Sequence, residues 1–237
     1  YNADIFNGLS RTLIKSIDVG TGTISAYTHG AMVAQCVMDS WGAADADWPR
    51  MLRSDMFSTY QVATGGLKAS DMDTQYNYAG NGITAIDPAA DVVIAGFGVN
   101  DNNAGVTVSA FQNSLLSVVD KIRTKQSCPI FLVQIPRNLT TGAQYDKYGA
   151  AMQNIAAIRA NVFYISTAEI WSSLTWNSDG GHLDAGGKIA IASFIEMKIL
   201  EALKIRLPYI RIAGKKYIAE NVVTEKHAMR IKGYEYI

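Results

Sequence analysis

Short, almost continuous apolar runs alternate with longer segments of helical period along most of this 237-residue chain. Runs of this kind, such as DVVIAGFG, are typical of strands that are covered on both faces. Strands that alternate with helical segments indicate βαβ units. The pattern therefore predicts an α/β fold with a short, parallel, five-stranded sheet. The expected strands are residues 31–38, 59–63, 91–97, 129–135 and 161–166.

Helices are expected between these runs, at residues 48–54, 70–78, 108–125, 144–160 and 184–203. The last of them has the strongest start signal, because Asp184 stands just before a long apolar stripe and can cap the first turn.

The two ends of the chain break the alternation. Residues 1–30 and 204–237 show short β-like patterns with Gly or Lys at the turns, so we expect β-rich segments that flank an α/β domain at residues 31–203. Two pairings are open for these segments: with each other, or with a second copy of the chain, which would make a homo-oligomer.

Charge and composition exclude several classes of partner. Lys plus Arg equals Asp plus Glu at 21 each, so the chain lacks the basic field that nucleic acid or an anionic membrane surface selects. No apolar run approaches the roughly 20 residues that span a bilayer. Cys and His show no metal-ligand spacing, so no metal site is expected.

Polar or glycine-rich loops follow four of the expected strands. In an open α/β sheet, reactive groups collect where the carboxyl ends of the strands meet the loops. MDSWG follows the first strand, TGGLKAS the second and FGVNDNN the third, and the fifth leads through EIWSSLTWN to SDGGH. The loops should therefore meet at one edge of the sheet.

The residues in these loops supply the parts of an acyl-transfer site. Ser40 is the expected nucleophile, and His182 is the base that accepts its proton. Asp179, three residues before His182, would orient the imidazole. The backbone N–H groups of Ser40 and Gly66 and the side-chain amide of Asn100 would form an oxyanion hole.

Taken together and in this order, the four loops resemble the SGNH hydrolases, also called GDSL-type esterases. Three blocks carry the resemblance: Thr64-Gly65-Gly66, Gly98-Val99-Asn100-Asp101 and Asp179-Gly180-Gly181-His182. The fourth is Met38-Asp39-Ser40, with Met where the family has Gly. The resemblance covers residues 31–203. It implies a flavodoxin-like, three-layer α/β/α fold and ester hydrolysis without a metal or an organic cofactor.

The substrate is less constrained than the chemistry. Trp41, Trp171 and Trp176 lie near the expected site, where each ring could stack on the flat face of a sugar or could instead pack in the core or between loops. Of these, Trp41 and Trp176 are the expected substrate contacts. The FGVND form resembles the acetylesterase branch of the family. We therefore expect hydrolysis of small acyl groups, O-acetyl above all, on a carbohydrate or polysaccharide, at an extracellular or virion surface. A lipid esterase or a thioesterase of the same family is an alternative.

Two alternatives lie outside the enzymes. Because Met38 could crowd the oxyanion site, the chain could be an inactive carbohydrate-binding module of a larger surface or phage tail protein. A flavodoxin-like ligand-binding domain is disfavoured, because MDSWG stands where a phosphate-binding glycine loop would follow the first strand.

Overall fold

The computed structural model describes residues 16–18, 23–25, 32–43, 47–52, 56–75, 90–142, 144–204, 209–212, 215–218, 220–225 and 228–232. The chain divides into two compact units, one formed by Gly30–Ile199 and the other by Tyr1–His29 with Leu200–Ile237. The expected domain limits at residues 30/31 and 203/204 stay predictions.

The larger unit is built on five parallel strands in the order β4-β3-β5-β6-β7. Their bounds are β3 Met32–Met38, β4 Phe57–Ala63, β5 Val92–Gly96, β6 Ile130–Val133 and β7 Val162–Ile165. Each lies within or close to the segment expected from the sequence, and β4 begins two residues earlier. The continuous apolar runs form strands because helices bury both faces of the sheet.

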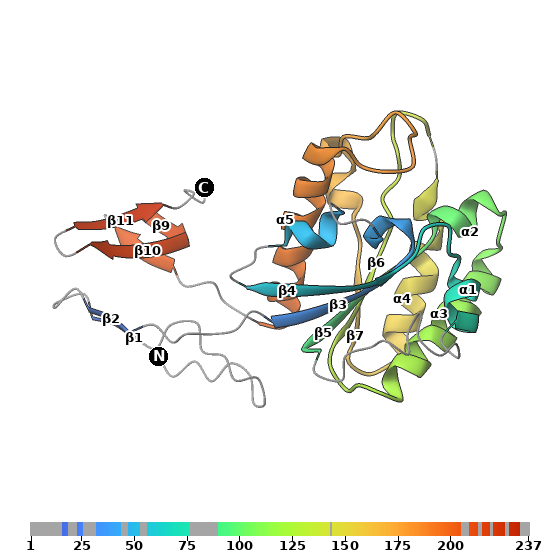
Figure 1. The fold of residues 1–237 in the computed structure, drawn as a ribbon, viewed down its shortest axis with the longest axis horizontal. Coiled ribbons are helices and arrows are strands. Elements are labelled where there is room, and N and C mark those ends of the chain that lie inside the picture. The colour runs from blue at the N-terminus through green and yellow to red at the C-terminus, as the bar shows by residue number, and fades with distance from the viewer. Residues whose placement is uncertain are drawn as a thin grey trace. The chain divides into compact units, whose positions relative to one another are not determined.

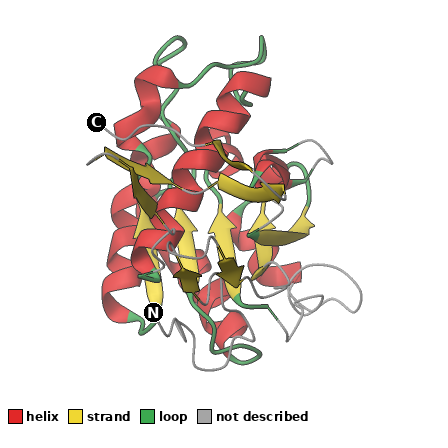
Figure 2. Ribbon diagram, turned by 90° about the vertical axis from the view of Figure 1, so that its left-hand side faces the viewer, coloured by secondary structure: helices red, strands yellow, loops and turns green. Residues whose placement is uncertain are grey.

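Helices lie on both sides of this sheet (Figures 1 and 2). α1 (Ala69–Gln75), α3 (Val108–Arg123) and α4 (Gly149–Ile158) lie on one face, and α5 (Ala185–Ala202) lies on the other (Figure 1). The order of these layers confirms the α/β/α fold expected from the sequence.

Successive side chains of β5 point to opposite faces of the sheet, and both faces are buried. Val93 and Ala95 of β5 belong to the same buried cluster as Leu115 of α3. Ile94 lies between them in sequence, points to the opposite face and is fully buried. Ile195 of α5 is fully buried as well. Both faces of the sheet therefore carry apolar cores, which fixes the strand ends rigidly beneath the loops.

Two of the expected helical segments contain 3₁₀ turns. The first is a 3₁₀ turn, η2 (Trp48–Met51), and the fourth is divided into a 3₁₀ turn, η4 (Tyr145–Tyr148), and α4. Among the described residues, three further short helices were not expected: η1 (Ser40–Gly42), α2 (Val99–Asn103) and η5 (Ala168–Ser173). In the part of the chain that the structure describes, no helix is long and apolar enough to span a bilayer.

In the part of the smaller unit that the structure describes, three pairs of antiparallel strands give the expected β structure at both ends of the chain. β1 (Ser16–Asp18) pairs with β2 (Thr23–Ser25). β8 (Tyr209–Ile212) pairs with β9 (Lys215–Ile218), and β10 (Glu220–Glu225) pairs with β11 (Ala228–Lys232).

Candidate active site

Because of the strand register, three of the four expected loops begin at the same edge of the sheet. Met38, the last residue of β3, lies opposite Ala63 at the end of β4 and opposite Gly96 at the end of β5. Ser40 therefore follows its strand at the same edge of the sheet as Gly66 and Asn100 follow theirs.

A sharp turn presents Ser40. The strand β3 ends at Met38, and the 3₁₀ turn η1 begins at Ser40. Between them, Asp39 caps the turn by accepting the backbone N–H of Trp41 on Oδ1 at 3.0 Å. Ser40 is only partly buried, whereas Asp39 and Trp41 on either side are buried. The turn thus exposes the hydroxyl and anchors its neighbours.

The fourth loop is a small hairpin that enters α5. Trp176 and Leu183 form an antiparallel bridge, and the N–H of Asn177 donates to the His182 carbonyl at 2.9 Å. Gly180 has a φ of 66°, a conformation that favours glycine. Asp184 then caps α5 by accepting the Gly187 N–H at 2.9 Å, as the sequence predicted.

Ser40, His182 and Asp179 form one chain of hydrogen bonds. Ser40 Oγ lies 2.9 Å from His182 Nε2, and His182 Nδ1 lies 2.7 Å from Asp179 Oδ2. With both ring nitrogens engaged, the neutral tautomer that fits carries its proton on Nδ1 and accepts the hydroxyl proton at Nε2. The structure brings these three side chains together as expected from the sequence.

The other oxygen of Asp179 is also engaged. Asp179 Oδ1 accepts the backbone N–H groups of Gly181 at 2.9 Å and His182 at 3.0 Å. The hydrogen bond from the His182 ring, with help from these two, holds the pKa of Asp179 below its ordinary value. The carboxylate is therefore ionised when it faces the imidazole.

Asn100 lies beside the loop that carries Gly66. Asn100 Nδ2 donates to the Leu67 carbonyl at 3.0 Å and lies 3.5 Å from Asp39 Oδ2. The first contact commits one amide hydrogen, and the second is too long to hold the other firmly. Gly66 has a φ of 83°, a region that its neighbour Gly65 does not adopt. Asn100 and the Gly66 loop therefore lie together at the edge of the sheet that carries Ser40.

Two buried carboxyl groups support this edge. Burial raises the pKa of Asp39 to about 7, although the bond from the Trp41 N–H opposes the shift. Burial also raises the pKa of Asp101 to about 6. Such shifts are common at functional sites because polar groups are held there in a dry environment.

Met38, the departure from the family pattern, packs beneath the turn. Its side chain is 1% exposed. A Cβ placed on Gly42 would lie 2.9 Å from Met38 Sδ, and one placed on Gly96 would lie 3.8 Å from Met38 Cε. Gly42 thus makes room for the methionine beneath η1, whereas a Cβ at residue 96 would only be in ordinary van der Waals contact with it.

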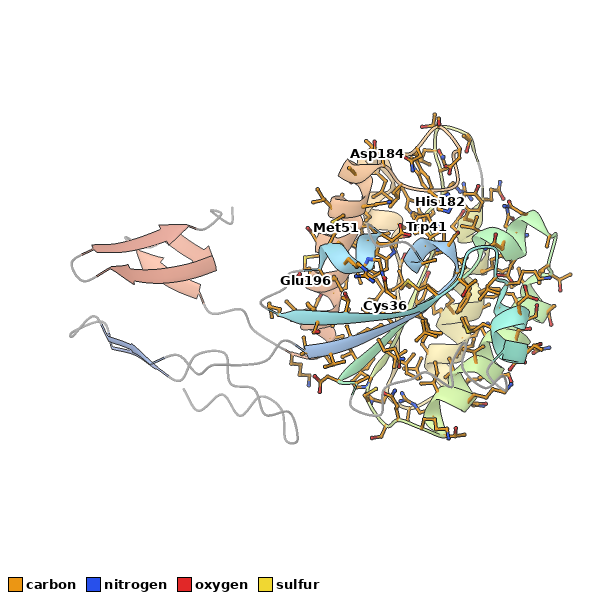
Figure 3. The ribbon with its side chains drawn as sticks, in the orientation of Figure 1. Cys36, Trp41, Met51, His182, Asp184 and Glu196 are labelled. Atoms are coloured by element: carbon orange, nitrogen blue, oxygen red, sulfur yellow. The ribbon has the colours of Figure 1, made fainter. Side chains whose placement is uncertain are left out.

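The two tryptophans expected to contact substrate are placed differently. Trp41 is only 3% exposed, and its Nε1 donates to the Gly181 carbonyl at 3.0 Å (Figure 3 shows Trp41 and His182 close together). Trp176 is half-buried, and its ring meets that of Trp41 edge-to-face with centroids 5.9 Å apart. Trp176 therefore offers ring surface beside His182, whereas Trp41 offers little.

The sequence analysis missed two residues next to this site. Asn138, in the loop after β6, is fully buried and donates from Nδ2 to the Gly180 carbonyl at 2.9 Å. Tyr145 is 8% exposed, with its ring centroid 6.5 Å from that of Trp176. The strand-end argument could have found Asn138, because it follows the fourth expected strand by three residues. No comparable feature of the sequence indicated that Tyr145 is buried.

Comparison with known families gives this geometry a context. A sequence model of the GDSL-like lipase/acylhydrolase family matches residues 27–188, which includes all four loops. The chain belongs to this family. Membership supports an esterase- or lipase-like hydrolase. No curated protein sequence is similar enough to the chain to count as a match.

Solved structures of the same fold are distant in sequence. A lipase/acylhydrolase from Enterococcus faecalis is 16% identical, with a TM-score of 0.57 over 74% of this chain and 99% of its own. TesA is 16% identical, with a TM-score of 0.56 over 72% of this chain and 99% of its own. A lipase, Lip_vut3, from a goat rumen metagenome is 16% identical, with a TM-score of 0.56 over 70% of this chain and 97% of its own. At these identities the likeness establishes the fold alone.

Proposed function

We propose that the protein is a serine esterase that removes small acyl groups, above all O-acetyl groups, from a carbohydrate or polysaccharide. The unbroken hydrogen-bond chain from Ser40 Oγ through His182 to Asp179 carries the proposal. Such a chain is the arrangement that turns a weakly nucleophilic hydroxyl into a nucleophile.

In the first half-reaction, Ser40 Oγ attacks the ester carbonyl as its proton passes to His182 Nε2. The imidazolium is stabilised by the ionised Asp179. The oxyanion of the tetrahedral intermediate accepts hydrogen bonds from the N–H of Ser40, the N–H of Gly66 and the free hydrogen of Asn100 Nδ2. When the intermediate collapses, the C–O bond breaks and the alcohol leaves with the proton held by His182.

In the second half-reaction, water replaces the alcohol. His182 Nε2 accepts a proton from the water, whose oxygen attacks the acyl carbonyl of Ser40. The acid then leaves, and Oγ recovers its proton. Every proton is carried by a side chain of the hydrogen-bond chain, so the cycle requires no metal or organic cofactor. Among the described residues, no group of three or more His, Cys, Asp or Glu side chains could hold a metal ion.

The preference for a sugar rests on Trp176. Its half-buried ring lies in the segment that leads into the Asp179–His182 hairpin, bridged to Leu183 next to His182. An indole with one face free can pack against the apolar face of a pyranose. The alcohol side of a sugar ester would then lie against Trp176 while its acyl carbon faces Ser40.

The test compares wild type with Ser40→Ala on p-nitrophenyl acetate, p-nitrophenyl butyrate and a panel of acetylated polysaccharides. The proposal expects selectivity for acetate and a loss of several orders of magnitude in kcat for the variant. Activity on butyrate above that on acetate would instead favour a lipid esterase or thioesterase of the same family.

A second candidate is a carbohydrate-binding module of a larger surface or phage tail protein. The hairpins that flank the hydrolase fold at both ends of the chain favour it. Glycan binding by a wild type that is as inert as Ser40→Ala would support this candidate over the enzyme.

A further inference from the structure

The two functional side chains of the loop that carries the base are partly exposed, although Gly180 between them is buried. The side chains of Asp179 and His182 are 52% and 37% exposed. Gly180 and Gly181 separate them, and glycine gives up more backbone freedom on ordering than any other residue. The hydrogen bonds of Asp179 are local to the loop. They fix its internal shape but do not fix its position over Ser40.

One attachment comes from the turn that presents Ser40. Trp41 Nε1 donates to the Gly181 carbonyl at 3.0 Å. Trp41 follows Ser40 in sequence, and Gly181 precedes His182. Two hydrogen bonds therefore connect the same two segments: the one from Trp41 to Gly181, and the one between Ser40 Oγ and His182 Nε2 at 2.9 Å. The indole is 3% exposed and packs edge-to-face on Trp176, so its donor has a fixed direction.

A second attachment comes from the loop after β6. Asn138 Nδ2 donates to the Gly180 carbonyl at 2.9 Å. Its Oδ1 accepts the N–H groups of Thr140 at 2.8 Å and Thr141 at 3.1 Å, which sets the orientation of the amide. Asn138 is fully buried, so leaving its side-chain N–H without the Gly180 carbonyl as acceptor would destabilise this arrangement.

We propose that Trp41 and Asn138 are positioning residues, which hold two successive carbonyls of the glycine pair and so keep His182 Nε2 within reach of Ser40. This inference rests on the proposed esterase function. Neither side chain needs to touch the substrate. A displacement of the reacting groups by about 1 Å can cost about 100-fold in rate, so loss of either attachment should lower kcat and leave KM nearly unchanged.

Trp41→Phe removes the indole donor and keeps an aromatic ring against Trp176. Asn138→Ser removes the amide donor and keeps an oxygen that can accept the Thr140 N–H. Trp171→Phe is the matched control, because Trp171 Nε1 donates at 3.1 Å to Thr167 Oγ1 and not to the loop of the base. All three variants are made in the full chain, and urea unfolding establishes that each is folded.

We expect kcat on p-nitrophenyl acetate to fall by about 10- to 100-fold in Trp41→Phe and in Asn138→Ser. KM should stay within about 3-fold of wild type, and Trp171→Phe should match wild type in both constants. The rate at which a fluorophosphonate labels Ser40 should fall in parallel with kcat, because that reaction uses the same base.

Other outcomes separate the two proposals. An inert wild type would contradict the esterase function itself. An active wild type with both variants within 2-fold of it in kcat would overturn the positioning roles. A kcat loss that appears equally in Trp171→Phe, or that follows the folded fraction, would also overturn them, since a general loss of stability would then explain it.

Discussion

The carboxylate of Asp101 accepts the backbone N–H of Ala69 with both oxygens, each at 3.2 Å. Asp101 follows Asn100, and Ala69 begins α1 three residues after Gly66. This contact therefore ties together two loops that each supply a candidate oxyanion donor. The sequence analysis assigned Asp101 no role in the chemistry, and its contact with Ala69 is one that sequence proximity could not reveal.

Asp101→Ala should loosen this tie. It leaves the buried N–H of Ala69 without its acceptor, which should lower the free energy of unfolding by about 1–3 kcal/mol. It should also lower kcat by about 10-fold or more, because the Gly66 loop and Asn100 are then held together less firmly, by the Asn100–Leu67 hydrogen bond alone. Asp101→Asn keeps one oxygen acceptor and should lose less of both. Urea unfolding and ester kinetics measure the two effects, and equal losses in both variants would contradict the explanation.

The glycine pair at residues 65 and 66 allows a matched comparison. Neither position has an atom within 4 Å of an added Cβ, but only Gly66 has a positive φ, at 83°. Gly66→Ala should therefore cost about 1–2 kcal/mol of stability through backbone strain alone. Gly65→Ala should stay within about 0.5 kcal/mol of wild type.

The same pair tests which glycine is the oxyanion donor. Removal of one such donor costs about 100- to 1,000-fold in kcat in a well-studied serine protease. A strained Gly66→Ala variant that displaces its N–H should approach that range, while Gly65→Ala should keep most of its activity. A larger loss of kcat in Gly65→Ala would move the donor to residue 65.

The burial of Asp39 predicts the direction in which protein stability changes with pH. Its pKa rises from the ordinary 3.8 to about 7 on folding. The folded state therefore holds this proton more tightly than the unfolded state. The associated stability is complete below pH 3.8 and is lost as the pH rises through about 7.

Asp39→Asn isolates this effect, because an asparagine oxygen can still accept the Trp41 N–H. The free energy of unfolding of wild type, minus that of the variant, should fall by more than about 1 kcal/mol between pH 4 and pH 8. Chemical denaturation at several pH values measures the difference. Parallel stability curves across this range would show that the folded state does not perturb the Asp39 carboxyl.

There is a physical reason why the sequence could predict the sheet and could suggest that Ser40, His182 and Asp179 meet. Strands buried on both faces must be apolar throughout, and in a parallel sheet their carboxyl ends meet at one edge. The sequence alone was therefore enough to expect Ser40, Asp179 and His182 at the same edge of the sheet.

The contacts that support the site could not be predicted in this way. The burial of Trp41 and Tyr145 depends on packing between segments that are far apart in sequence. The hydrogen bond from Asn138 to Gly180 spans 42 residues and depends on the conformations of two loops. Helical period does not show whether Tyr148 is buried. It is a core residue that stacks on Phe111 with centroids 4.1 Å apart.

Met38 offers the sharpest comparison with the family pattern, because Met38→Gly would restore the family's residue. If the methionine crowded the oxyanion site, this change should raise kcat. The packing indicates the reverse, since the buried side chain fills space that Gly42 leaves open. Met38→Gly should therefore lower the free energy of unfolding by about 3 kcal/mol or more, with no gain in kcat.

Met38→Leu is the control for this change. Its volume is similar, so the cost should stay below about 1.5 kcal/mol, and kcat should stay near the wild-type value. Urea unfolding together with p-nitrophenyl acetate hydrolysis measures both variants. A rise in kcat in Met38→Gly, with stability preserved, would show that the methionine restrains the site. The absence of a side chain at Gly42 would then not be enough to accommodate the methionine without cost to catalysis.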